Sequence, residues 1–388
     1  MQKRFLIKNI MLQSLYIKNY RNLKELTIDS LSQINLINGE NNTGKTSLLE
    51  ALAIYASNAN LESLCQMIES RGERLHNNNK KNEVQSILDF FSSIFTDRDI
   101  DMTDEKSIII GEKSGFKIKI QFIAYFDKII RDEQGENLMT KRIIISKDDF
   151  EQYPDYTVGL MINSDIIPIA YFISDSSVSY RIIRAKEKKE VVHSEYISTN
   201  NIDKEINAKL FDNIALTEQE KSVISALNII EPNIEGLAFI DDRENVRSFN
   251  GNRDKSRNAV VKIKNKLERL PIKSMGDGIN RILTIILAMV NSQNGFVLID
   301  EFENGLHYKV QEKLWKIIFK LAKDLNIQVF ATTHSSDCIN SFSRVLDNNE
   351  YNVTGQFLRL DNRNGIIQPE IINSEVLKIA DNQKIELR

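Results

Sequence analysis

Three polar segments, far apart in the sequence, contain the residue types that phosphate chemistry requires. The first runs from Gly39 to Thr46 and matches the pattern GxxxxGK[ST]. In this pattern, backbone N–H groups wrap the phosphates of a nucleotide at the N-terminus of a helix, where the helix dipole also favours an anion. A glycine-rich turn without a ligand is the alternative. Apolar residues before the loop and periodic leucines after it predict a strand and a helix, which favours the nucleotide site.

Individual roles in this loop follow from the chemistry of each residue type. Gly39 and Gly44 permit the tight turn, Lys45 reaches the β and γ phosphates, and the Thr46 hydroxyl binds Mg²⁺. Further nucleotide contacts are expected from the remaining loop residues and from the start of the helix, namely Asn41, Asn42, Thr43 and Ser47.

The second segment, GFVLIDEFENGLH, places two carboxylates after four apolar residues at 296–299. This arrangement is typical of a strand that is buried on both faces and ends at a crevice. Phosphoryl transfer depends on positioning and on charge neutralisation. We therefore expect Asp300 to hold Mg²⁺, directly or through water, and Glu301 to orient and polarise the attacking water. Two solvated acids at an exposed strand end are the alternative.

The third segment, IQVFATTHS, predicts another strand, and residues 310–325 before it repeat apolar side chains at helical spacing. A strand, a helix and a strand in this order form a right-handed parallel unit. His334 should therefore lie at the same sheet edge as Asp300 and Glu301, where we expect it to sense the γ phosphate. His307, in the loop after the carboxylates, is compatible with either loop packing or function.

The octet SMGDGINR, residues 274–281, precedes a strongly apolar helix. Gly276 and Gly278 allow a ligand to approach the backbone closely, and Ser274 offers a hydroxyl group. Exposed N–H groups at this helix N-terminus predict a second anion site, although a plain helix cap is the alternative. One nucleotide does not require two phosphate sites from the same chain.

The order of these segments, phosphate loop, SMGDG, LIDEFENGLH and FATTHS, resembles that of ABC-type ATPases. This resemblance implies that ATP and Mg²⁺ bind between two copies of the chain in a head-to-tail homodimer. The octet of one copy would then contact the γ phosphate held by the other. Met275 and Asp277 depart from the usual LSGGQ-like core, so the implied nucleotide contacts are limited to Ser274, Gly276 and Gly278.

The fold implied by this resemblance is α/β. It is an ABC-type P-loop ATPase with a mostly parallel core sheet, a flanking antiparallel β-lobe and an inserted helical region. The expected division is a core at 1–56 and 270–345, an insert at 57–269 and a C-terminal extension at 346–388. In the insert, a hairpin about Ser114 and Gly115 and strands near 142–146 and 166–173 fit the β-lobe.

The opening segment LQSLYIKNYRNLKELTI is similar to the first strands of RecF, SMC and OLD-like (overcoming lysogenization defect) ATPases. DEFENGLH and QVFATTHSSDCI look most similar to the OLD-like group. These similarities imply that Arg21 lies near the nucleotide. In the same family a glutamine of the β-lobe contacts Mg²⁺, and Gln121 is the candidate here. The insert lacks the sustained heptads that SMC proteins carry.

Composition and charge narrow the possible partners. The net charge is −3 at pH 7, so a DNA contact needs a local basic patch. Residues 243–269 contain nine basic side chains against three acidic ones, which indicates either a solvated face or a contact with DNA. The nine are Arg243, Arg247, Arg253, Lys255, Arg257, Lys262, Lys264, Lys266 and Arg269.

No apolar run approaches the length of a membrane span, so we expect a cytoplasmic protein without membrane contact. Many OLD-like proteins continue into a TOPRIM nuclease domain, but too few residues follow His334 for one. We therefore expect an ATPase without its own nuclease. It resembles the ATPase subunit of two-gene anti-phage defence systems such as PARIS, which would be a homodimeric sensor that controls a separate nuclease effector. The alternative is a RecF-like, ATP-gated DNA clamp in repair.

Overall fold

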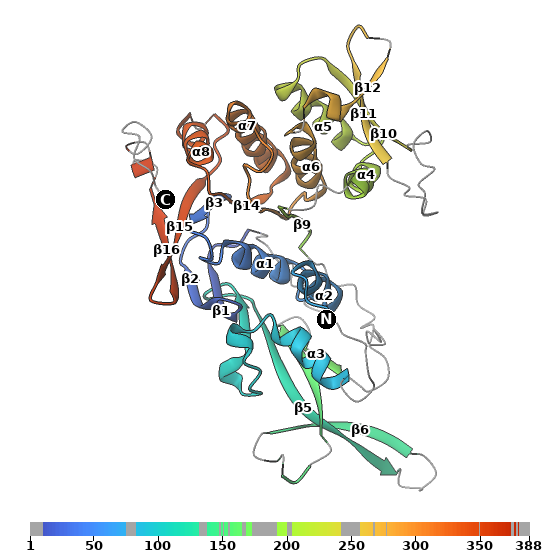
Figure 1. Cartoon of the computed structure of the whole chain (residues 1–388), viewed down its shortest axis with the longest axis vertical. Helices are drawn as coiled ribbons and strands as arrows, with labels where there is room; N and C mark the ends of the chain where they lie inside the picture. The colour runs from blue at the N-terminus through green and yellow to red at the C-terminus, as the bar shows by residue number, and fades with distance from the viewer. Residues whose placement is uncertain are drawn as a thin grey trace, which may run out of the picture.

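The computed structural model describes residues 11–74, 83–131, 138–146, 149, 151–153, 156–164, 168–172, 192–199, 204–241, 257–266, 268–276, 278–348, 350–373, 376–377 and 379. These residues form three sheets with helices packed between and around them (Figure 1). Within these ranges, no helix combines the length and the apolar character that a membrane span requires.

A six-stranded sheet lies at the centre of the molecule and carries the predicted site segments. Its order is β16-β15-β3-β14-β13-β9, and every neighbouring pair is parallel except β15 with β16. The strands are β3 (Ile34–Gly39), β9 (Ser194–Ile197), β13 (Phe296–Ile299), β14 (Gln328–Thr332), β15 (Gly355–Arg363) and β16 (Ile366–Ile372). The sheet therefore draws strands from the expected core, from the insert and from the C-terminal extension.

A seven-stranded sheet flanks it and is antiparallel throughout, in the order β2-β1-β4-β5-β7-β8 with β6 paired to β5. Its strands are β1 (Leu15–Tyr20), β2 (Leu23–Ile28), β4 (Ile108–Gly111), β5 (Lys117–Arg131), β6 (Leu138–Ile145), β7 (Thr157–Ser164) and β8 (Pro168–Phe172). The hairpin predicted about Ser114 and Gly115 is confirmed as the turn between β4 and β5.

A third sheet is antiparallel and consists of β10 (Ile234–Asp241), β11 (Arg257–Ile263) and β12 (Arg269–Pro271). The described fold is therefore α/β with mixed sheets: a central sheet in which every neighbouring pair except β15 with β16 is parallel, and two antiparallel sheets. Antiparallel pairing accounts for more of the described strands than parallel pairing does, so the fold as a whole is mixed.

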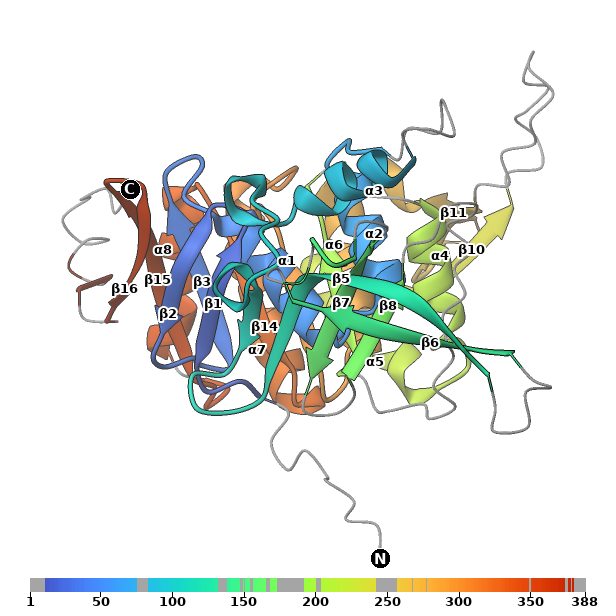
Figure 2. The same cartoon turned by 90° about the horizontal axis from the view of Figure 1, so that it is seen from below.

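Helices cover both faces of the six-stranded sheet (Figure 1). The described α-helices are α1 (Lys45–Ala56), α2 (Leu61–Ser70), α3 (Glu83–Ser92), α4 (Lys204–Asp212), α5 (Glu218–Ile230), α6 (Gly278–Asn291), α7 (Tyr308–Leu325) and α8 (Ser336–Asn348). One face carries α6, α7 and α8. The other carries α1, which lies between this sheet and the seven-stranded sheet, as the view from below also shows (Figure 2).

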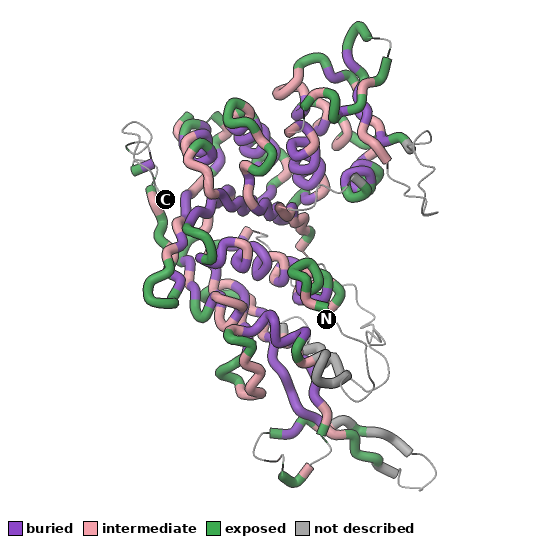
Figure 3. Tube along the Cα trace, in the orientation of Figure 1, coloured by how far each residue is buried: buried purple, intermediate pink, exposed green. Residues whose placement is uncertain are grey.

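Two apolar cores fill the spaces on either side of the six-stranded sheet, and its strands β3, β13 and β14 are buried along their length (Figure 3). Side chains of β13 alternate between them, because successive residues of a strand point to opposite faces. Val297 and Ile299 join the core of α6, α7 and α8, while Phe296 and Leu298 join the core around α1. The predicted strand at 296–299 is therefore confirmed, and burial on both faces explains its unbroken apolar sequence.

Candidate active site

The loop from β3 to α1 has the backbone path of a phosphate cradle. Gly44, just before α1, has a φ of 84°, and Gly39 has a φ of 152°. A Cβ atom at Gly39 would lie 2.5 Å from Leu360 O, and one at Gly44 would lie 2.7 Å from a Leu23 methyl group. Only glycine fits at both positions. The chain can therefore turn tightly into the N-terminus of α1, where N–H groups and the helix dipole favour a phosphate.

Lys45 is buried at the first position of α1, and its Nζ donates to Gly39 O and Glu40 O, both at 2.7 Å. Burial lowers the pKa of Lys45 to about 8, and the carboxylates that follow β13 act in the opposite direction. An added phosphate would favour the charged ammonium in the same way as those carboxylates do.

The other loop residues differ in their surroundings. Thr43 is buried, and its hydroxyl donates to Glu40 O at 2.8 Å, so it braces the loop from inside. Asn42 has a φ of 64°, and its carbonyl accepts from the Asn22 side chain at 3.1 Å. Asn41 is exposed and Ser47 is buried in α1. Asn41 and Asn42 thus lie at the open side of the cradle.

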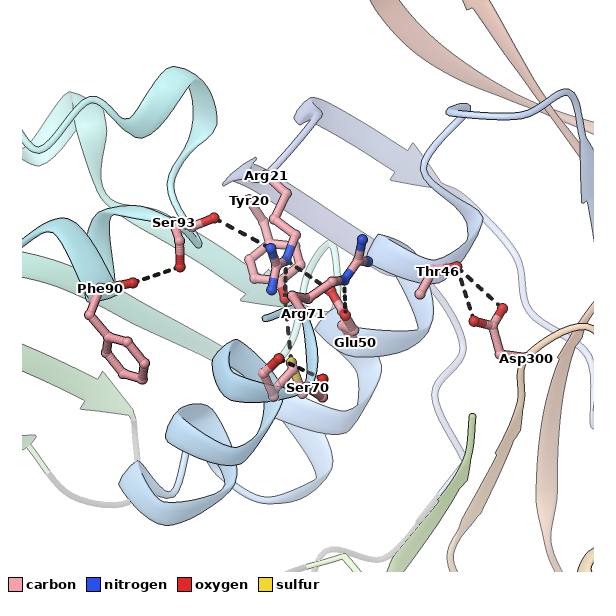
Figure 4. Close-up of polar contacts among 10 residues, drawn as sticks. Tyr20, Arg21, Thr46, Glu50, Ser70, Arg71, Phe90, Ser93 and Asp300 are labelled. Carbon is pink, nitrogen blue, oxygen red and sulfur yellow. Dashed lines mark hydrogen bonds and ion pairs between the residues drawn. The ribbon is translucent and has the colours of Figure 1, made fainter. Parts of the chain in front are cut away.

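Asp300 follows β13, is only 5% exposed and collects hydroxyl groups. Its carboxylate accepts from Thr332 at 2.7 Å and from Thr46 at 3.0 and 3.3 Å (Figure 4), and the Thr199 hydroxyl lies 3.5 Å away. The structure therefore brings together Thr46 and Asp300, the predicted Mg²⁺ pair. Carboxylate and hydroxyl oxygens are suitable ligands for this cation, so the residues present fit it.

Thr199 is a site residue that the sequence did not reveal. It follows β9, which pairs in parallel with β13 so that Ile197 lies opposite Ile299. Parallel strands that are in register end at the same edge, and this places Thr199 beside Asp300. The four-residue strand that positions it is too short to show a periodic pattern.

Gln121 is the third predicted Mg²⁺ ligand. It is on β5 of the seven-stranded sheet, opposite Met161. Within the described ranges, its buried Oε1 has no hydrogen-bond partner, and no hydrogen bond joins it to Thr46 or Asp300. Its role as a ligand stays a prediction, whereas the Thr199 hydroxyl lies beside Asp300.

Glu301 occupies an unusual backbone conformation, with a φ of 47°. Its N–H donates to the Thr332 hydroxyl at 2.8 Å. Its carboxylate is half-buried and accepts no hydrogen bond from another described residue, so it retains its capacity to bind and polarise water. A left-handed conformation in a residue other than glycine is strained, and such strain is common at functional sites.

His334 follows β14 at the same edge of the sheet, and Glu303 holds the turn that presents it. The Glu303 carboxylate accepts from the His334 N–H and from the Thr333 hydroxyl, both at 2.7 Å. The His334 side chain is half-exposed and forms no hydrogen bond with another described residue. Glu303 was not predicted, although its place two residues after Glu301 is a signal that could have indicated it.

His307 has a structural contact that favours the packing alternative. It is the N-cap of α7, where its Nδ1 accepts from the Lys309 N–H at 3.3 Å. Its ring also packs on Tyr308, with centroids 4.4 Å apart. An N-cap side chain satisfies one of the otherwise unpaired N–H groups of a helix, which accounts for this histidine without a role in catalysis.

Arg21 lies beside α1, but its contacts are with protein groups (Figure 4). Its Nε forms an ion pair with Glu50 at 2.9 Å, and its Nη1 donates to Ser93 O at 3.4 Å. Arg71 and Tyr20 bind the same buried carboxylate, at 2.8 and 3.1 Å. The buried Nη2 of Arg21 has no hydrogen-bond partner among the described residues.

The octet leads into α6, which packs on the opposite face of the six-stranded sheet from α1. Ser274 belongs to a single 3₁₀ turn, Ile272–Met275, and its hydroxyl donates to Pro271 O at 2.7 Å. Gly276 has a φ of 113° with open space around it, and Gly278 begins α6. Asp277 lies outside the described residues. Because α6 and α1 pack on opposite faces of the sheet, these residues do not complete the phosphate cradle of their own chain.

Part of the basic patch proves to be paired. Arg257 binds Asp212, and Lys262 lies 3.2 Å from Glu235. Both acids lie outside residues 243–269 and were therefore missed by a count along the sequence. Exposed basic residues remain at Lys264, Lys266 and Arg269. The other four, Arg243, Arg247, Arg253 and Lys255, lie outside the described residues.

Several known proteins are similar to this chain in sequence or in fold. An ATP/GTP phosphatase of Helicobacter pylori is 26% identical over 362 residues, which cover 88% of this chain and 90% of that protein. The DNA replication and repair protein RecF of Rickettsia prowazekii is 40% identical over 57 residues, 15% of this chain and 16% of that protein. The solved SmcHead bound to the C-winged helix domain of ScpA aligns over 94% of this chain and 99% of its own, with a TM-score of 0.48 and 11% identity.

A family model described as an AAA ATPase domain matches residues 11–339. The matched range begins before β1 and includes the phosphate loop, Asp300, Glu301 and His334. It thus covers most of the chain together with the hydroxyl and carboxylate groups that converge on one sheet edge. This chain belongs to the AAA ATPase domain family.

Proposed function

We propose that this ATPase works as a head-to-tail homodimer of the OLD-like kind and that its nucleotide state controls a separate nuclease effector in anti-phage defence. One observation supports the dimer: α1, which follows the phosphate loop, and α6, which begins within the octet, pack on opposite faces of the central sheet, so the two helix N-termini approach from different sides. Two-fold pairing would juxtapose the octet of each copy with the phosphate loop of the other.

The chemistry at each site follows from the described side chains. The Lys45 ammonium would leave its two carbonyl partners for the β and γ phosphates of ATP. Thr46 and Asp300 would hold Mg²⁺, with Thr199 beside them, and the cation would supply charge neutralisation on the phosphate oxygens. Arg21 is proposed to reach the nucleotide through Nη2, and Gln121, whose buried Oε1 is unpartnered among the described residues, stays a proposed Mg²⁺ ligand.

Glu301 is proposed to act on the attacking water. Its carboxylate would accept a proton as the water oxygen bonds to the γ phosphorus and the bond to the bridging oxygen of ADP breaks. His334, at the end of the neighbouring parallel strand, would contact the γ phosphate from the side of β14. Ser274, Gly276 and Gly278 of the partner copy would complete the surroundings of the γ phosphate and exclude bulk water from it.

The effector proposal rests on the resemblance to two-gene systems and on the position of the octet. The octet lies between the three-stranded sheet and α6, so closure on ATP would also move that outer region. A surface that shifts with nucleotide state is suited to hold and release another protein.

The Glu301→Gln variant tests both parts of the proposal. It should bind ATP, hydrolyse it at least about a hundredfold more slowly and accumulate as a dimer, because a positioned general base contributes about this much. Light scattering after size exclusion, with and without ATP, measures the mass, and Ser274→Arg added to Glu301→Gln is the control that should stay monomeric. A mass that ATP does not change would contradict the composite site.

Affinity purification of tagged Glu301→Gln protein from its host, with ATP present, tests the effector. A stoichiometric nuclease in the mass spectrum would support the sensor. Recovery of the homodimer with DNA or repair proteins would support the alternative, a RecF-like clamp. The exposed Lys264, Lys266 and Arg269 next to the octet favour that alternative, and it requires DNA binding that ATP stimulates and salt weakens.

A further inference from the structure

Arg281, the last residue of the octet, has no role in the functions described so far. It lies in the first turns of α6 and is only 1% exposed. Its guanidinium donates to three backbone carbonyls: Ser198 O at 2.9 Å, Asp300 O at 2.7 Å and Glu301 O at 3.4 Å. All three follow the carboxyl ends of β9 and β13, the two strands that bring Thr199 and Asp300 together.

The burial of this cation is costly and calls for a reason. Within the described ranges, no carboxylate is within ion-pair distance of Arg281, and its Nε has no hydrogen-bond partner. Burial lowers the pKa of Arg281, and the nearby carboxylates of Asp300, Glu301 and Glu303 oppose that effect. A residue of similar size without charge would avoid the desolvation cost if Arg281 served only to fill the core.

What the guanidinium restrains is the backbone of the hydrolytic carboxylate. Glu301 has a φ of 47° and needs restraint from both sides to keep it. On one side, the Thr332 hydroxyl accepts from the Glu301 N–H at 2.8 Å, and the Thr332 carbonyl accepts from the Phe302 N–H at 2.8 Å. On the other side, Arg281 binds the carbonyls of Asp300 and Glu301.

We infer that Arg281 is a positioning residue. It fixes the backbone next to Thr199 and at Glu301 relative to each other, and it links both to the octet. It is three residues from Gly278, where α6 begins. A displacement of the octet when it meets ATP would therefore pull on the same carbonyls that orient the water-polarising carboxylate. The coupling of Arg281 to the partner's nucleotide rests on the proposed homodimer. The restraint of Arg281 on the Glu301 backbone involves residues of one chain only.

The variants Arg281→Gln and Arg281→Lys test this role. Arg281→Gln should lower kcat about tenfold to a hundredfold while ATP affinity changes less than about twofold, because the loss affects orientation and not phosphate binding. Arg281→Lys retains a positive donor and should recover part of kcat. Thr284→Val is the matched control, since Thr284 is buried on the same helix and its hydroxyl donates only to Asn280 O at 2.9 Å.

An optical readout separates positioning from general destabilisation. Trp315 is the only tryptophan of the chain, and it stacks on Phe302, next to Glu301, with centroids 4.2 Å apart. Its emission should change in Arg281→Gln but not in Thr284→Val, at temperatures below the unfolding transition of both. Normal kcat in either Arg281 variant would overturn the inference, as would equal losses of kcat and ATP affinity in Arg281→Gln and in Thr284→Val.

Two results distinguish this inference from the proposed function. In the Glu301→Gln background, Arg281→Gln should still form the ATP-dependent dimer, since the octet glycines and the phosphate loop are intact. If Glu301→Gln itself stays monomeric, the dimer is wrong, and the kcat of the Arg281 variants still decides the hold on Glu301. If Arg281→Gln does not fold, the kcat of Arg281→Lys decides: an intermediate value supports the inference and a normal value overturns it.

Discussion

At the scale of single residues, three carboxylates of the site act electrostatically on one buried lysine. Asp300, Glu301 and Glu303 all follow β13, and each favours the charged form of Lys45, yet burial still lowers its pKa to about 8. The ammonium is therefore less firmly protonated than an ordinary lysine. Binding of ATP phosphates should restore its proton, so nucleotide affinity and protonation are linked.

This linkage predicts a pH dependence of ATP binding. The pKa of Lys45 is lowered from 10.5 to about 8, so the ammonium is charged below pH 8 and loses its proton as the pH rises through 8. ATP affinity should be constant below pH 7.5 and fall by up to about tenfold per pH unit above 8. Titration calorimetry from pH 7 to 9.5 measures this. The control is Lys45→Arg, which stays charged over this pH range. It should bind ATP less tightly than the wild type, but its ATP affinity should not fall above pH 8. The same fall in the control would show that another group causes the pH dependence.

At the scale of elements, parallel pairing gathers the polar groups. Ile299 of β13 lies opposite Ala331 of β14 and opposite Ile197 of β9, so the three strands end level with one another. Thr332 and Asp300 are the residues that come next in the chain after the paired positions of β14 and β13, and Thr199 comes two residues after Ile197, so the three side chains meet at this edge.

The contribution of β9 predicts that Thr199 supports Mg²⁺ binding. Thr199→Val keeps the shape of the side chain but removes the oxygen that lies 3.5 Å from Asp300. The Mg²⁺ concentration for half-maximal ATP hydrolysis should rise several-fold, about the effect of losing one group around a metal site. Thr199→Ser restores the oxygen and should be close to the wild type. Identical Mg²⁺ curves for the valine variant and the wild type would remove Thr199 from the site.

At the scale of the whole molecule, the central sheet separates the helices that follow the two predicted anion sites. α1, after the phosphate loop, packs on one face, and α6, which begins within the octet, packs on the other (Figure 1). A rigid sheet of six strands cannot fold back to join them. Their separation makes the proposed site a property of two chains.

Mixing two inactive variants tests the shared site. Lys45→Ala loses the phosphate loop contact and keeps the octet, while Ser274→Arg blocks the octet and keeps the loop. An equimolar mixture should recover about a quarter of the wild-type rate, because half of randomly formed dimers are mixed and each has one intact site of two. Phosphate release measures the rate. Mixing Lys45→Ala with Gly276→Arg should recover the same activity, and no recovery in either mixture would count against contact between chains.

The sequence alone determined the local parts of the site. The phosphate loop, the strand at 296–299 and the carboxylates after it follow from spacing and from an unbroken apolar run, because these constraints act between neighbours in the chain. The hairpin about Ser114 and Gly115 was predictable for the same reason. Asp300 and Thr46 could be predicted as a pair of Mg²⁺ ligands because the sequence shows where β13 and β3 end.

Tertiary structure decided every feature that depends on which strands become neighbours. Thr199 enters the site through the pairing of β9 with β13, and Arg281 binds carbonyls that no sequence pattern marks. The acids that pair with Arg257 and Lys262 likewise come from distant segments. Pairing between distant strands depends on how buried surfaces match across the whole fold, and that information is not carried by any one segment.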